Sequence, residues 1–73
     1  MKPGDLFKIN VTVMAWQSPT PSAHAMRTRL DEGDIITFLN VTENANYCRS
    51  LSKFGVCYVY EGYYAEFFEK LLP

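Results

Sequence analysis

Residues 7–16 alternate strictly between two kinds of side chain. The odd-numbered positions are all apolar, whereas the even-numbered positions begin polar and end with Met14 and Trp16. Successive side chains of a β-strand point to opposite faces, so this period of two predicts a strand whose odd-numbered face lies in a core. The expected core positions of this strand are Phe7, Ile9, Val11, Val13 and Ala15.

Further strands are predicted in the middle of the chain. Ile35–Val41 follows a tight turn at residues 31–34 and is apolar on both faces, which is typical of a central, buried strand. Residues 47–51 and 56–60 flank a turn that contains a glycine, and together they predict a β-hairpin.

The register of that hairpin decides how Cys48 and Cys57 are related. A turn at residues 52–53 puts them directly opposite each other, and a four-residue loop ending at Gly55 makes them diagonal neighbours on one face. A loop with an odd number of residues separates them to opposite faces. Two cysteines are too few for a disulfide framework and lack metal-ligand spacing, so we expect reduced thiols that share one face.

Two segments lack strand character. Residues 17–29 contain Pro19 and Pro21 and predict a long irregular loop, with a helical turn over residues 22–30 as the alternative. Residues 63–72 change to a helical period, which predicts a short amphipathic helix that closes one mouth of a barrel. A 3₁₀ turn followed by a last strand is the alternative for this tail.

These elements predict a mainly β fold, a small barrel of five strands with a long loop after the first strand and a short C-terminal helix. The chain has 73 residues, which favours a single domain over residues 1–73, and its 48% hydrophobic content is enough for a core. Beyond the first strand, the expected core residues are Leu30, Ile36 or its neighbour Ile35, Leu39, Val56 and Phe67.

The order of these parts resembles the Src-homology-3-like small barrel. Residues 30–36 (LDEGDII) resemble the diverging turn of that fold, and residues 53–60 (KFGVCYVY) resemble the strand after its distal loop. The chain is also similar to short phage-encoded proteins of this fold whose role is unknown. Members that bind polyproline carry an acidic long loop and a paired Trp, whereas this chain has Arg27 and Arg29 in the loop and Tyr47 near the Trp position.

Composition excludes several classes of function. A net charge of −1 and a pI of about 5.7 argue against a nucleic-acid binder, which normally carries a basic stripe. No apolar run approaches the ~18 residues of a membrane span, and residues 1–5 carry no secretory signal, so we expect a cytoplasmic protein. In a cytoplasm, we expect the two Asn-Val-Thr sequons to be ordinary strand residues.

The sequence contains no motif for catalysis, for a metal or for a cofactor, so a non-catalytic protein is expected. His24 is the sole histidine and has no acidic residue at ligand spacing and no nucleophile beside it. Asp31, Glu32 and Asp34 form an acidic cluster, but turn and strand-entry chemistry explains them.

The candidate binding residues are aromatic, apolar or basic. Trp and Met are enriched at the centres of interfaces, and Tyr combines a ring with a polar tip, so these residue types suit a docking surface. The candidates are Met14, Trp16, His24, Arg27, Arg29, Tyr47, Tyr58, Tyr60 and Tyr63.

The leading hypothesis is therefore a module that docks a partner protein. The phage resemblance implies that this partner is a host protein or a phage assembly component. Weak nucleic-acid association and a homo-oligomeric structural role are the alternatives.

Overall fold

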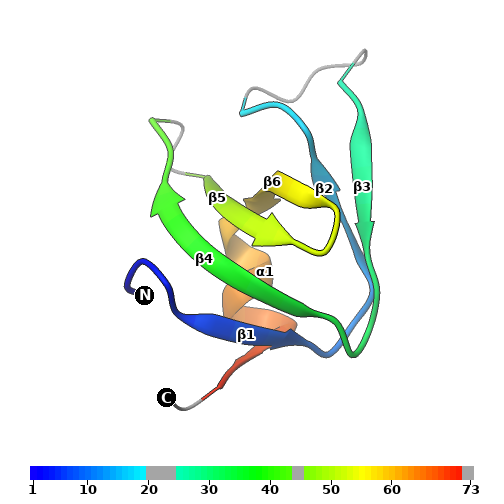
Figure 1. The fold of residues 1–73 in the computed structure, drawn as a ribbon, viewed down its shortest axis with the longest axis vertical. Helices are drawn as coiled ribbons and strands as arrows, with labels where there is room; N and C mark the ends of the chain where they lie inside the picture. The colour runs from blue at the N-terminus through cyan, green and yellow to red at the C-terminus, as the bar shows by residue number, and fades with distance from the viewer. Residues whose placement is uncertain (20–24, 44–45, 72–73) are drawn as a thin grey trace.

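The computed structural model describes residues 1–19, 25–43 and 46–71 (Figure 1). In this part of the chain, seven strands form one antiparallel sheet in the order β3-β2-β6-β5-β4-β1-β7. The sheet curls into a half-barrel, and one short helix lies behind it (Figure 1). The elements are β1 (Leu6–Ile9), β2 (Val13–Trp16), β3 (Arg27–Leu30), β4 (Ile35–Val41), β5 (Tyr47–Ser52), β6 (Gly55–Tyr60), α1 (Glu61–Glu66) and β7 (Phe68–Lys70). The protein is thus mainly β, with seven strands where five were expected.

The first predicted strand is split by a bend at residues 10–12. Before the bend, β1 pairs with β4 and β7, and after it β2 pairs with β3 and β6. Val11 lies in the bend and is 46% exposed, so its predicted place in the core is wrong. The other odd-numbered residues of this run are buried, namely Phe7, Ile9, Val13 and Ala15. The bend contains three residues, so Ile9 before it and Val13 after it still face the same side.

The end of the predicted long loop is a strand. β3 pairs along its whole length with β2, from Val13 opposite Leu30 to Trp16 opposite Arg27. The alternative of a helical turn over residues 22–30 is therefore wrong for residues 27–30, and residues 22–24 lie outside the described part of the chain.

The turn before β4 and the central hairpin form where the sequence predicts them. Gly33 has a φ of +92°, a conformation that glycine adopts without strain, and β4 has the predicted bounds. β5 and β6 pair with Ser50 opposite Cys57 and Leu51 opposite Val56. This register puts Val56 on the outer face, where it is 42% exposed, so its prediction as a core residue is wrong.

Only one face of β4 is buried. Ile36 and Phe38 are in the core, whereas Ile35 is 46% exposed, so a strand buried on both faces was the wrong expectation. The register between β4 and β5 shifts between Phe38 and Asn40. Leu39, an expected core residue, lies at this irregularity and is only partly buried.

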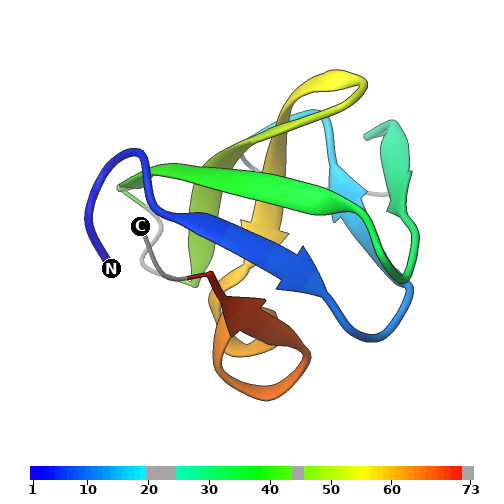
Figure 2. The same ribbon diagram turned by 60° about the horizontal axis from the view of Figure 1, so that its bottom comes forward.

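The C-terminal segment combines the two alternatives for the tail. α1 covers six residues and ends at Glu66, after which β7 adds to the edge of β1. Figure 2 shows α1 and β7 together on one side of β1. Tyr64 on α1 and Phe68 on β7 are buried, and Phe67 between them packs partly buried against the core. The helix is thus shorter than expected because the chain turns to form one more strand.

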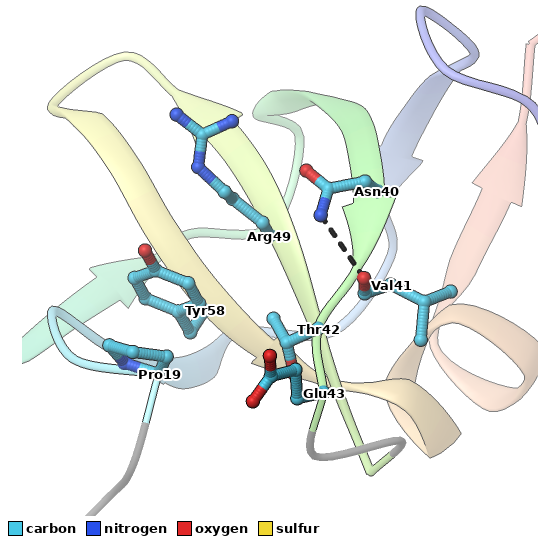
Figure 3. A pocket seen from close by; sticks show the side chains of 7 residues that line it. All are labelled: Pro19, Asn40, Val41, Thr42, Glu43, Arg49 and Tyr58. Atoms are coloured by element: carbon cyan, nitrogen blue, oxygen red, sulfur yellow. Dashed lines mark hydrogen bonds between the residues drawn. The ribbon is translucent and has the colours of Figure 1, made fainter.

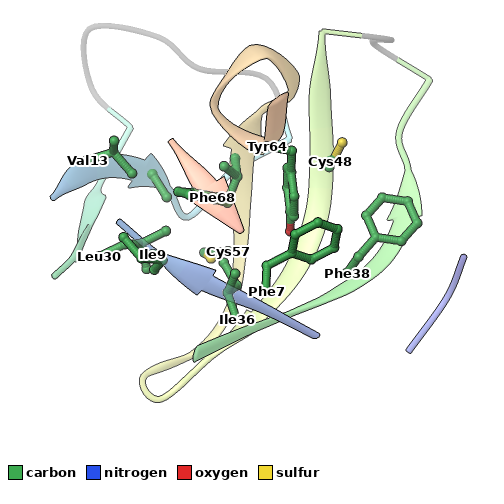
Figure 4. Close-up of a cluster of buried hydrophobic side chains, with 12 residues drawn as sticks. Phe7, Ile9, Val13, Leu30, Ile36, Phe38, Cys48, Cys57, Tyr64 and Phe68 are labelled. Carbon is green, nitrogen blue, oxygen red and sulfur yellow. The ribbon is translucent and has the colours of Figure 1, made fainter. Parts of the chain in front are cut away.

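The core lies inside the curl and contains an aromatic cluster (Figure 4). The Tyr64 ring centroid lies 4.8 Å from that of Phe7, 5.9 Å from that of Phe38 and 4.9 Å from that of Phe68. These are edge-to-face contacts, the arrangement that aromatic rings favour. The buried hydrophobic residues are Phe7, Ile9, Val13, Ala15, Leu30, Ile36, Phe38, Cys48, Cys57, Val59, Tyr64 and Phe68.

Two adjacent isoleucines of β4 provide a matched test of this core. Ile36→Ala removes a fully buried side chain, so we expect the free energy of unfolding to fall by about 2–5 kcal/mol. Ile35→Ala on the opposite face should cost less than about 1 kcal/mol. Urea unfolding of both variants measures the difference, and equal losses would contradict the assignment of the two faces.

Candidate functional site

A row of four side chains crosses the outer face of the sheet, and we call it the outer row. Trp16 on β2 stands opposite Arg27 on β3 and, on its other side, opposite Tyr58 on β6. Tyr58 in turn stands opposite Arg49 on β5. The outer row therefore reads Arg27, Trp16, Tyr58, Arg49 across four neighbouring strands.

Strand alternation places these side chains outside the core. The residues beside them on their own strands, such as Ala15, Thr28, Cys57 and Ser50, are buried, so the outer row must face the other way. Trp16, Tyr58 and Arg49 are partly exposed and Arg27 is exposed. Two aromatic rings flanked by two guanidinium groups are thus available to a ligand.

The two arginines of the outer row differ from the other cations nearby. The Arg27 guanidinium lies 5.0 Å from the centroid of the Trp16 ring, within the range of a cation–π contact. Arg29 pairs with Asp31, and Lys53 pairs with Asp31 and Asp34. Within the described residues, neither Arg27 nor Arg49 forms an ion pair. Both guanidinium groups are therefore available to pair with an anionic group of a bound molecule.

A pocket of about 410 Å³ adjoins the Arg49 end of the outer row (Figure 3). Tyr58 and Arg49 line it from the hairpin, and Pro19 lies beside the Tyr58 ring (Figure 3). The remaining lining residues, Asn40, Val41, Thr42 and Glu43, come from the end of β4 and the segment after it. The pocket thus continues the outer row beyond Arg49, and its walls come from three separate segments of the chain.

A second group, which we call the aromatic chain, runs from β5 onto α1. Tyr47 contacts Tyr60, Tyr60 contacts Tyr63, and Tyr63 contacts Phe67, with ring centroids 6.1, 5.4 and 5.6 Å apart. Tyr63 and Phe67 also line a groove with Met14, Arg29 and residues 11–13, which run from the bend into β2. The aromatic side chains of this groove lie next to the strand that carries Trp16.

The structure thus divides the candidates from the sequence into two neighbouring groups. Trp16, Arg27 and Tyr58 lie in the outer row; Tyr47, Tyr60 and Tyr63 lie in the aromatic chain; Met14 and Arg29 are cross-strand partners in the adjoining groove. His24 lies outside the described residues.

Sequence reasoning missed Arg49, Pro19 and Phe67 as surface residues. Arg49 could have been found, because it lies two residues after Tyr47 on the same strand and so shares its face. Pro19 and Phe67 had no such signal, since only the tertiary structure brings them beside Tyr58 and Tyr63.

The buried polar groups form no comparable site. The hydroxyl oxygens of Ser50 and Tyr64 lie 2.5 Å apart inside the core, which satisfies both. Cys48 and Cys57 are free thiols, fully buried, and lie on the same face of the hairpin as diagonal neighbours, because Cys48 stands opposite Val59 and Cys57 opposite Ser50. No cluster of metal-ligating side chains occurs in residues 1–19, 25–43 and 46–71, and no helix there has the length and apolar character to cross a membrane.

Both cysteines should be reduced but unreactive in the folded protein. Burial raises the pKa of both, so the reactive thiolate is scarce and inaccessible at neutral pH. Thiol titration of freshly purified protein without reductant should therefore count no reactive thiols in the native state and both in urea. A count of zero in urea would reveal a disulfide and contradict this assignment.

Alkaline pH should destabilise the fold through the same groups. Burial raises the pKa of the Cys57 thiol from an ordinary value of 9.0 to about 11, and it also raises the pKa of Tyr64. The unfolded chain loses these protons first, so stability is full below pH 9 and falls as the pH approaches about 11. The urea midpoint should follow this course, and Cys57→Ala should lessen the fall. A midpoint that stays constant over this range would contradict the prediction.

Comparison of the chain with protein-family models, with curated proteins and with solved structures found no match.

Proposed function

We propose that this chain is a non-catalytic protein-interaction module that docks a partner protein on the outer row and the adjoining aromatic chain. The observation that carries the proposal is the uninterrupted order Arg27, Trp16, Tyr58, Arg49 across four strands. Trp, Tyr and Arg are the residue types most enriched among those that dominate binding energy at interfaces. Here they lie side by side and partly exposed.

A relation to the Src-homology-3-like small barrel belongs to the same proposal. The order of parts supports it: an opening strand, the β2–β3 hairpin in place of the long loop, a turn ending in Gly33 and Asp34, the β5–β6 hairpin, and a short helix before the last strand. The similarity to short phage-encoded proteins of this fold rests on the same order. On this proposal the partner is a host protein or an assembly component in a host cytoplasm.

Self-association is a second candidate, and a mostly apolar row on the same sheet favours it. Leu6, Thr37, Leu51 and Val56 stand opposite one another across β1, β4, β5 and β6. Leu6 and Leu51 are each 44% exposed, and Phe54 at the hairpin turn is 67% exposed. A second copy would bury these side chains. Sedimentation across a range of concentrations tests this candidate.

Nucleic-acid association draws some support from the outer row, because stacked aromatic rings beside arginines also suit single strands. Against it, the described cations Arg29, Lys53 and Lys70 are engaged with carboxylates, and the net charge is −1. We therefore rank a protein partner first.

The experiment that tests the proposal removes the two rings of the outer row in turn. Trp16→Ala and Tyr58→Ala should weaken binding of a partner, captured from lysate and then purified, by more than about 1 kcal/mol. Because both side chains are partly exposed, the melting temperature should change little. Val56→Ala, on the same face of β6 but outside the outer row, is the matched control.

Two results would contradict the proposal. In one, binding of the purified partner is unchanged by Trp16→Ala and Tyr58→Ala but is lost with Val56→Ala. In the other, Trp16→Ala melts the protein and leaves association unaltered, which would make Trp16 a structural residue.

A further inference from the structure

The spacing of charges along the outer row restricts what can bind there. The backbone positions of Arg27 and Arg49 are separated by three strand-to-strand steps of about 4.8 Å each, which is roughly 14 Å along the row, and both side chains are long enough to adjust to a ligand. The rings of Trp16 and Tyr58 fill the space between them. A matching ligand carries two anionic groups at about this separation, with an apolar group between them.

An extended peptide supplies this pattern at one residue spacing. Side chains at positions i, i+2 and i+4 of an extended chain point to one side, and about 3.3 Å of rise per residue puts the outer two roughly 13 Å apart. We propose that the outer row binds an extended acidic peptide, with Asp or Glu at i and i+4 and an apolar side chain at i+2. This inference rests on the proposed function, because it uses the same surface.

The contacts of each position follow from the structure. The first acidic side chain pairs with Arg27, whose guanidinium already lies over Trp16, and the second pairs with Arg49 at the pocket. The central apolar side chain covers the rings of Trp16 and Tyr58. Bidentate pairing between guanidinium and carboxylate gives this pattern its geometric specificity.

The other charged residues near the outer row restrict the peptide sequence but leave the row with a net positive charge. Glu43 lines the same pocket as Arg49, so the peptide should bear no further acidic residue beyond the one at Arg49. Arg29 stands opposite Met14, next to the row, and is already paired with Asp31. The outer row therefore keeps a positive balance of two arginines against one glutamate.

The test uses a synthetic peptide, Gly-Glu-Thr-Leu-Thr-Glu-Gly, and the intrinsic fluorescence of the protein. Trp16 is the only tryptophan, so its emission reports on the outer row directly. The isomer Gly-Glu-Glu-Thr-Leu-Thr-Gly has the same composition but lacks the spacing, and it should bind about tenfold more weakly. A peptide with Lys in place of both Glu should not bind.

Protein variants locate the site. Arg27→Gln and Arg49→Gln should each weaken binding of the first peptide about tenfold, and the double variant should abolish it. Lys8→Gln removes the same charge from β1, away from the outer row, and should leave binding unchanged. Equal affinity for the two isomers, or an equal loss with Lys8→Gln, would overturn the acidic pattern.

A single-stranded oligothymidylate is titrated in parallel at two salt concentrations. Tight binding that falls steeply with salt and is lost in the Arg27→Gln, Arg49→Gln double variant would assign the outer row to nucleic acid and overturn the peptide inference. If the purified partner depends on Trp16 and Tyr58 but neither isomer binds, the acidic pattern fails and the docking surface stands. If binding of the purified partner is unchanged by Trp16→Ala and by Tyr58→Ala, the proposed function itself fails.

Discussion

The fold depends on the hydrogen bonds that hold the bend at residues 10–12. The Ile9 N–H donates to the Asp34 carbonyl and the Gly33 N–H donates to the Ile9 carbonyl, with nitrogen–oxygen distances of 2.9 and 2.7 Å. On the other side, the Asn10 N–H donates to the Phe67 carbonyl at 2.8 Å. These bonds tie the bend to the turn before β4 and to the end of α1. They allow one run of chain to serve as β1 and then as β2, and so to bridge the two ends of the curl.

Within the curl, a polar contact couples the helix to the sheet. Tyr64 on α1 reaches Ser50 on β5, and both residues are almost fully buried. A buried hydroxyl without a partner is costly, so this pairing also selects the position of the helix. No buried side-chain nitrogen or oxygen in the described residues lacks a partner. The three aromatic neighbours of Tyr64 then complete the packing around it.

The outer row is a consequence of the same architecture. Trp16 can stand between Arg27 and Tyr58 only because β2 leaves the bend to pair with β3 on one side and with β6 on the other. Arg49 joins the row through the register of the β5–β6 hairpin. A shift of that register by one residue would put Arg49 and Tyr58 on opposite faces and turn one of them into the core, since side chains alternate between the faces. The surface is thus as strongly determined by strand register as the core is.

The sequence by itself determined the buried face of the first strand on either side of the bend, the β4 turn and the place of the central hairpin, because period-two alternation and turn residues are local signals. It also identified Trp16, Arg27 and the tyrosines as surface candidates, although not which of them meet. The bend had no such signal, since the segment contains neither glycine nor proline and keeps Ile9 and Val13 in phase. Val11 was misplaced for that reason, and Phe67 was assigned to a helix that stops one residue earlier. Strand order, β3, β7 and the alignment of Arg27 with Arg49 were decided by the tertiary structure, because they depend on hydrogen bonds between residues distant in the chain.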